Sequence, residues 1–223
     1  MLSKKATQTG SFFYMMNLMN FSKSHFYLSV LAIAAVFLFL TFHETPVKQP
    51  DGVLIKIDPQ QEVTTAKPFQ KEGYLITPLN TYKLRARVLG KKHYRFSKWA
   101  SISPIDLALG WDVMSSNFYL NQLKVSQKRR WYYVKWGGFA AVSEQKIFNN
   151  SANVHILPAS KDVEKAVKRF KEGSLVELEG FLVRVDDTEK NRWWVSSRSR
   201  TDRGDGSCEV FYVTKANFTY FDK

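Results

Sequence analysis

The sequence predicts an α+β protein in which an N-terminal transmembrane helix precedes one domain with a curled antiparallel sheet and a packed helix. We expect this sheet to form a partial barrel of the OB or SH3-like kind. Three observations predict the fold class: one uncharged stretch near the N-terminus, short alternating segments separated by turn residues, and a single strongly amphipathic segment. A chain of 223 residues has room for an anchor and one domain that buries a sizeable core.

The uncharged stretch is Phe26–Phe42, whose 17 residues would form a helix roughly 25 Å long. A buried core helix is disfavoured because the stretch has almost no polar face. No small-residue cleavage pattern follows it, which favours an uncleaved signal anchor over a secretory signal peptide. Lysines are the only charged residues before it, so the positive-inside rule places residues 1–25 in the cytoplasm. We therefore expect a single-pass protein of the inner (cytoplasmic) membrane with an extracytoplasmic domain.

Residues 43–72 are rich in Pro, Gln, Thr and Lys and predict a linker. Within this linker, Gly52–Ile57 alternates apolar and polar residues, which favours an early strand. Residues 73–223 are expected to form the extracytoplasmic α+β domain. Without the three N-terminal lysines, the chain has 30 basic residues (33 − 3) against 20 acidic ones, a net charge of about +10. This charge favours anionic partners such as lipid headgroups, cell-wall polymers or nucleic acid, and it is equally compatible with a solvated surface.

Four segments in the first half of the domain have clear secondary-structure patterns. Tyr82–Gly90 alternates apolar residues with lysine and arginine, which predicts a half-buried strand. Ser103 followed by proline is typical of a helix start, so we expect a short helix that Gly110 closes. A second short helix is expected from about Ser115, and Arg129–Gly138 predicts a strand that ends in a Gly-Gly turn.

The second half of the domain contains the amphipathic helix and three strands. We expect a helix over Ser160–Glu172, because its serine can cap the N-terminus, apolar residues recur at helical spacing, and Gly173 can end it. Leu175–Asp186 predicts a long strand that bends at Gly180, where one face changes from polar to apolar. Two further strands in "RWWVSS" and "CEVFYV" are expected to complete a meander of three contiguous strands.

Catalytic and metal-binding motifs are sparse. No metal site is expected, because the domain offers only His93, His155 and Cys208 as histidine or cysteine ligands, and no pair has zinc spacing. No cofactor is expected either, since phosphate loops are missing from the sequence, and no nucleophile elbow indicates a catalytic serine. A cysteine nucleophile needs a nearby imidazole, so His155, Cys208 and an arginine are the one catalytic set to weigh.

Sortases, which are extracytoplasmic cysteine transpeptidases, are similar in layout: a signal anchor, a small β-barrel and a His, Cys and Arg set. Their Thr-Leu-x-Thr-Cys motif with a downstream arginine differs from "GDGSCEVFYV", in which no arginine follows the cysteine. Cys208 opens a predicted strand and is expected to be a small buried residue. We therefore expect a protein that is not an enzyme.

A basic and aromatic stretch near the C-terminus is the remaining candidate site. We expect an anionic ligand or a partner to bind at Arg192, Trp193, Arg198, Arg200 and Arg203. Since successive residues of a strand point to opposite faces, one of the adjacent Trp193 and Trp194 must face inward. The alternative is a packed hairpin with a solvated basic edge.

Four segments resemble the landmarks of a family of bacterial predicted single-pass membrane proteins. They are "SPIDLALGWDVMS", "SANVHILPA", "LEGFLVRVD" and "SSRSRTDRGDGSCEVFYV", and the resemblance runs from about Gly73 to Val213. It implies a bacterial source, and it carries no known activity and no catalytic residue.

Together these features predict a membrane-anchored extracytoplasmic binding or assembly module without catalytic activity. Its expected partners are the membrane and an envelope protein or anionic polymer, and export disfavours nucleic acid. The alternative is a cysteine-dependent, transpeptidase-like enzyme that modifies the cell wall with Cys208 and His155.

Overall fold

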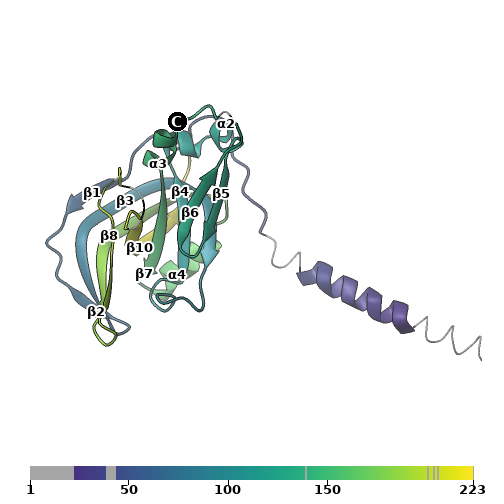
Figure 1. The fold of residues 1–223 in the computed structure, drawn as a ribbon, viewed down its shortest axis with the longest axis horizontal. Helices are drawn as coiled ribbons and strands as arrows, with labels where there is room; N and C mark the ends of the chain where they lie inside the picture. Colours follow the sequence, from purple (N-terminus) through teal and green to yellow (C-terminus); the bar gives the residue numbers. More distant parts are fainter. Residues whose placement is uncertain are drawn as a thin grey trace, which may run out of the picture. The chain divides into compact units, whose positions relative to one another are not determined.

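The computed structural model describes residues 23–38, 44–138, 140–199, 201–202, 204 and 206–222 (Figure 1). The chain divides into two units, Met1–Glu44 and Thr45–Lys223. In the first unit, residues 23–38 are helical. Across the described residues, no helix is both long and apolar enough to span a membrane. The predicted anchor, Phe26–Phe42, extends past this helix into residues 39–42, which lie outside the described residues.

The second unit is a mixed α+β domain with a large curled sheet and few helices. The sheet contains β1 (Gln60–Val63), β2 (Phe69–Lys71), β3 (Tyr74–His93), β4 (Ile105–Gly110), β7 (Ser151–Pro158), β8 (Leu175–Asp187), β9 (Arg192–Val195) and β10 (Glu209–Phe218). A separate hairpin consists of β5 (Lys124–Lys128) and β6 (Trp131–Lys135). The helical elements are η1 (Asp112–Ser115), α2 (Asn117–Leu120), α3 (Glu144–Asn149) and α4 (Lys161–Arg169).

Five strands of the sheet close into a ring. The hydrogen-bonded neighbours run from β3 to β4, β7, β10 and β8, and β8 pairs with β3 again. The ring can close because β3 is 20 residues long: its Leu75–Arg87 part pairs with β8, and its Arg87–His93 part pairs with β4. The β7–β10 pair is parallel, with Val210 opposite His155, and the other pairs are antiparallel. Figure 1 shows β3 as the long curved strand of this ring.

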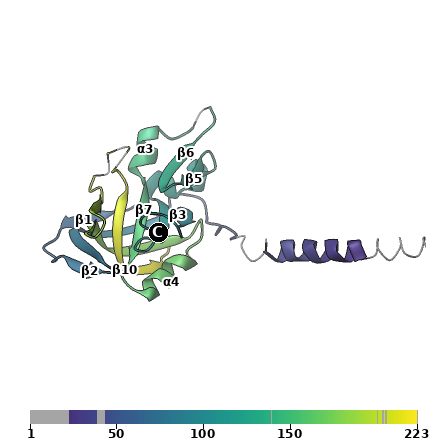
Figure 2. The same ribbon diagram turned by 60° about the horizontal axis from the view of Figure 1, so that its bottom comes forward.

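The main core fills the inside of the ring. Its members alternate along every strand, as in Leu107 of β4, Val154 of β7 and Phe211 of β10, which are all fully buried. Helix α4 packs Val163 and Val167 onto the same core and lies beside β10 (Figure 2). The residues of β4 and β7 that alternate with these core residues therefore point to the outer face of the ring.

The amphipathic helix is confirmed, with a shorter end than predicted. The Ser160 side chain accepts a hydrogen bond from the backbone N–H of Val163, as an N-cap does. The helix ends at Arg169 and not at Glu172. Phe170 already has an extended backbone, and its side chain is fully buried in the core. Burial of the Phe170 phenyl group therefore ends the helix.

Two sequence predictions are wrong. Ser103–Gly110 was expected to contain a short helix, yet β4 is a strand whose six residues are all buried. A strand buried on both faces has no alternating polar residues, so its pattern resembles that of a short buried helix. Gly52–Ile57 forms no strand, because the backbone N–H groups of Leu54 and Ile55 donate to Oγ of Ser115 at 3.0 and 3.1 Å.

The last strands confirm part of the predicted arrangement. Strand β8 approaches its neighbour β10 closely at Gly180, where a Cβ would lie 2.0 Å from the carbonyl oxygen of Tyr212. The β10 register shifts at this point, between Val213 and Lys215. The three strands are contiguous, but β8 lies between β9 and β10, so they do not form a meander. Strand β10 pairs with β7 on its other side, which the sequence did not indicate.

Candidate functional site

A buried polar cluster covers the outer face of β4 and β7. Asp106, Asn153 and His155 point outward because their neighbours Leu107 and Val154 face the core. The β5–β6 hairpin lies over this face. Gln127 of the hairpin donates to the Asn153 side chain at 2.8 Å, and Asn153 donates to the carbonyl oxygen of Arg130 at 2.9 Å.

Asp106 is the centre of this cluster and is fully buried. One oxygen, Oδ1, accepts a hydrogen bond from Nη1 of Arg130 at 2.8 Å and lies 2.9 Å from Nδ1 of His155. Arg130 also donates to the carbonyl oxygen of Ser103 at 2.7 Å and to Oγ of Ser97 at 2.8 Å. A carboxylate in this environment is stabilised by its two partners, since an unpaired buried charge would be costly.

The environment changes the proton affinities of both partners. Burial lowers the pKa of Arg130, and the charge of Asp106 opposes part of that effect. Burial also acts to lower the pKa of His155, but Asp106 and the nearby Cys208 side chain outweigh it, so the pKa of His155 is raised. His155 is therefore held as a cation over a wider pH range than a free imidazole.

The turn that carries Arg130 has a strained backbone. Arg129 and Arg130 connect β5 to β6 with φ angles of 53° and 67°, in the left-handed region. A two-residue turn of this kind favours Asn-Gly, and two arginines there cost conformational energy. Contacts of Arg130 offset that cost: its backbone N–H donates to the Tyr94 hydroxyl at 2.9 Å, and its guanidinium lies 4.2 Å from the Tyr94 ring centre. The predicted strand over Arg129–Gly138 thus begins two residues later, after this turn.

A cavity of about 510 Å³ opens beside the cluster; we call it the tryptophan cavity. Its lining residues are Trp99, Arg130, Trp131, His155, Trp193, Trp194, Val195, Gly204, Gly206 and Cys208. Trp99 and Trp194 stack with ring centres 5.4 Å apart, and the His155 ring lies 4.5 Å from that of Trp194. The cavity therefore combines flat apolar walls with a buried imidazole and a guanidinium.

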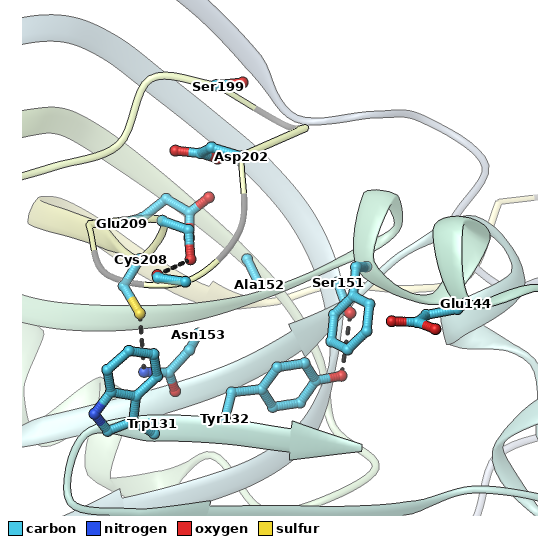
Figure 3. A pocket seen from close by; sticks show the side chains of 13 residues that line it. Trp131, Tyr132, Glu144, Ser151, Ala152, Asn153, Ser199, Asp202, Cys208 and Glu209 are labelled. Carbon is cyan, nitrogen blue, oxygen red and sulfur yellow. Dashed lines mark hydrogen bonds between the residues drawn. The ribbon is translucent and has the colours of Figure 1, made fainter. Parts of the chain in front are cut away.

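A second cavity, of about 350 Å³, shares Trp131, Gly204 and Cys208 with the first (Figure 3). Figure 3 shows the Cys208 sulfur directed toward Asn153, whose side-chain amide donates to it at 3.8 Å. Cys208 was expected to be buried; instead the residue is partly exposed and lines both cavities.

The residues predicted to bind a ligand have different roles in the structure. Arg192 pairs with Asp187 at 2.7 Å and lies over the Trp99 ring. Trp193 is 61% exposed, whereas Trp194 is half-buried and packs against Trp99 and His155; both tryptophans line the tryptophan cavity.

The predicted arginines of the following loop are not part of the cavity wall. Arg198 is exposed and outside the residues that line it, and its carbonyl oxygen accepts a hydrogen bond from Gln61. Arg200 and Arg203 lie outside the described residues.

Sequence reasoning missed Asp106, Arg130 and Trp99. Asp106 did leave a signal, because a lone carboxylate inside the apolar run "SPIDLALG" predicts a buried charge that needs a partner. The partner Arg130 is 24 residues away and gives no local signal.

Over the described residues, no group of three or more His, Cys, Asp or Glu side chains is arranged to hold a metal ion. No protein-family model matches the chain, and no curated protein is significantly similar to it.

Proposed function

We propose that this protein is a membrane-anchored extracytoplasmic binding module that holds its ligand in the tryptophan cavity. The strand order supports an OB-like barrel, which is a closed or partly open five-stranded Greek key. In such a barrel, strands one to five follow the order 1-2-3-5-4 with a parallel pair between strands three and five. The order β3-β4-β7-β10-β8, the parallel β7–β10 pair and helix α4 between β7 and β8 all match.

The position of the cavity is the observation that carries this proposal. OB barrels bind ligands on the face of strands two and three and at the loops that follow strands one and four. The corresponding strands here are β4 and β7, and His155 on β7 lines the cavity. The loop between β3 and β4 supplies Trp99, and the segment between β8 and β10 supplies Trp193, Trp194 and Cys208.

The chemistry of the site favours an anionic glycan of the cell envelope as the ligand. Indole faces offer flat apolar surfaces on which sugar rings can stack, and OB-like barrels bind oligosaccharides. The net charge of about +10 outside the N-terminal lysines attracts a polyanion. A protein partner of the envelope would use the same face and is an outcome of the test below.

The test is a titration of the full chain in detergent with an oligogalacturonate, followed by tryptophan fluorescence and calorimetry. A neutral glucan of equal length is the comparison ligand. Trp193→Ala should weaken binding about 10-fold, equivalent to about 1.4 kcal/mol, because it removes one stacking wall. Trp136→Ala is the matched control, since Trp136 is a partly exposed indole outside the cavity lining.

Two results would contradict the proposal: equal binding of the neutral and anionic glycans, or equal loss in both tryptophan variants. Absence of glycan binding together with capture of an envelope protein through Trp193 would move the proposal to a protein ligand.

The location has its own test. A reporter that is active only after export, fused to the C-terminus, should be active. A silent fusion, with a cytoplasmic reporter active in its place, would overturn the extracytoplasmic location.

A further inference from the structure

The tryptophan cavity also contains an arrangement of side chains that binding alone does not require. Cys208 immediately precedes β10, which runs parallel to β7 with Val210 opposite His155. Because Cys208 is two residues before Val210, its side chain lies on the same outer face as Asn153 and His155. The contact from the Asn153 amide to the sulfur confirms this placement, and the Cys208 side chain is near enough to the imidazole to help raise the pKa of His155.

The other side of the imidazole faces a buried carboxylate. Nδ1 of His155 lies 2.9 Å from Asp106, while His155 itself is 3% exposed and lines the cavity. Carboxylate, imidazole and thiol thus follow one another in the order that activates a nucleophile: the carboxylate orients the base, and the base takes the proton of the thiol. The three groups come from β4, β7 and the start of β10, so the strand order of the ring brings them together.

A guanidinium cation lies next to them. Two nitrogens of the Arg130 guanidinium bind Asp106 and the loop before β4, and its Nε is buried and has no hydrogen-bond partner among the described residues. Arg130 lines the same cavity as Cys208. An Asp106–Arg130 pair that served the fold alone would need neither a thiol at the cavity wall nor the His155 imidazole beside the carboxylate.

We propose that Cys208 accepts an acyl group from an ester ligand in the tryptophan cavity, with His155 as the base and Asp106 as a positioning residue. The sulfur forms a bond to the carbonyl carbon and the ester C–O bond breaks. The thiol proton passes to His155 and then to the departing alkoxide, which leaves as an alcohol. Ester and thiol become thioester and alcohol, and nothing is oxidised or reduced.

The ligand class follows from the cavity. Its walls are mostly indole rings, so the acyl group that fits is apolar and short enough for about 510 Å³. This covalent capture goes beyond the proposed binding of a glycan and does not depend on it. Retention of one acyl group per chain is compatible with a module that does not turn over.

The experiment treats the full chain in detergent with 4-nitrophenyl butyrate. We expect a burst of one equivalent of 4-nitrophenolate and one butyryl group on Cys208, located by mass spectrometry of peptides. Cys208→Ser and Cys208→Ala should lose the thioester. His155→Gln should slow acylation at least 100-fold, whereas His93→Gln, a histidine at the end of β3 outside the cavity lining, should leave the rate unchanged.

The positioning role of Asp106 has a separate readout. Asp106 helps to raise the pKa of His155, so Asp106→Asn should move the rise of the acylation rate to lower pH. Tryptophan fluorescence of each variant reports whether it is folded, and His155→Gln keeps the test decisive if Asp106→Asn unfolds.

Three results would overturn the inference: acylation at the same rate in His155→Gln, acylation no faster than in the urea-unfolded chain, or modification of lysines in place of Cys208. Acylation without glycan binding would leave this inference intact and remove the proposed glycan, and the reverse result would do the opposite.

Discussion

Replacing Asp106 with asparagine removes the negative charge that Arg130 and His155 share. The volume of the side chain is nearly unchanged, so no cavity forms and the packing of β4 stays the same. Arg130, whose side chain is 13% exposed, and the buried His155 then lose their common counter-charge. The effect of this substitution therefore measures electrostatics and hydrogen bonding rather than packing.

The expected loss is large. Removing one partner of a buried ion pair costs about 3–5 kcal/mol, and asparagine keeps one acceptor oxygen, so we expect about 3 kcal/mol. For a domain of this size, each kcal/mol lowers Tm by about 2–4 °C, which gives a fall of roughly 6–12 °C.

The same substitution changes the pH dependence of stability. The pKa of His155 is raised in the folded state, so protonated His155 favours folding. This contribution is fully present below the unfolded pKa of about 6.5 and is lost as pH rises through the higher folded value. Asp106→Asn removes the charge that raises this pKa, so the decrease in stability above about pH 6.5 should be smaller in the variant.

The assay is urea unfolding of the full chain in detergent, followed by tryptophan fluorescence at several pH values. Asp58→Asn is the control, because Asp58 is exposed, and its effect should stay within about 0.5 kcal/mol. A loss below about 1 kcal/mol for Asp106→Asn, or an unchanged pH profile, would refute the assignment of Asp106 as the charged centre of the cluster.

Three further substitutions test the fold. Gly180→Ala should destabilise by more than about 2 kcal/mol, because its Cβ would lie 2.0 Å from the carbonyl oxygen of Tyr212; an unchanged urea midpoint would contradict the close approach of β8 and β10. Ser160→Ala should cost about 1 kcal/mol by removing the acceptor for the Val163 N–H, and circular dichroism should detect a loss confined to helix fraying. Leu107→Ala should cost about 3 kcal/mol in thermal unfolding, since the side chain is fully buried inside the ring; a loss below 1 kcal/mol would place it elsewhere.

Local sequence patterns predicted the elements that have one buried face and one exposed face. The alternation in Tyr82–Gly90 and the helical spacing after Ser160 are read directly from neighbouring residues, and both elements are present. Gly180 also lies opposite the register shift of β10, so the predicted irregularity falls at this position, although the shift is in β10. The same reasoning failed at β4, because a strand that is buried on both faces has no periodicity to read.

The candidate site was only partly predictable. His155 and Cys208 were named from the sequence as a set to weigh, and Trp193 as a candidate binding residue. Asp106, Arg130 and Trp99 could not be joined to them, since β4, the β5–β6 turn and the loop before β4 are separated from β10 by long stretches of chain.

The sequence by itself determined the positions of the uncharged stretch, the amphipathic helix and the long strand β8, and the presence of one cysteine and few histidines, because these depend on residue identity and near neighbours. Only the tertiary structure decided that β10 lies parallel to β7, that the ring closes through β3, and that Asp106, His155 and Cys208 meet beside one cavity. The physical reason is that strand order depends on the free energy of burying all inner faces together. That free energy is a property of the whole chain, and no local pattern records it.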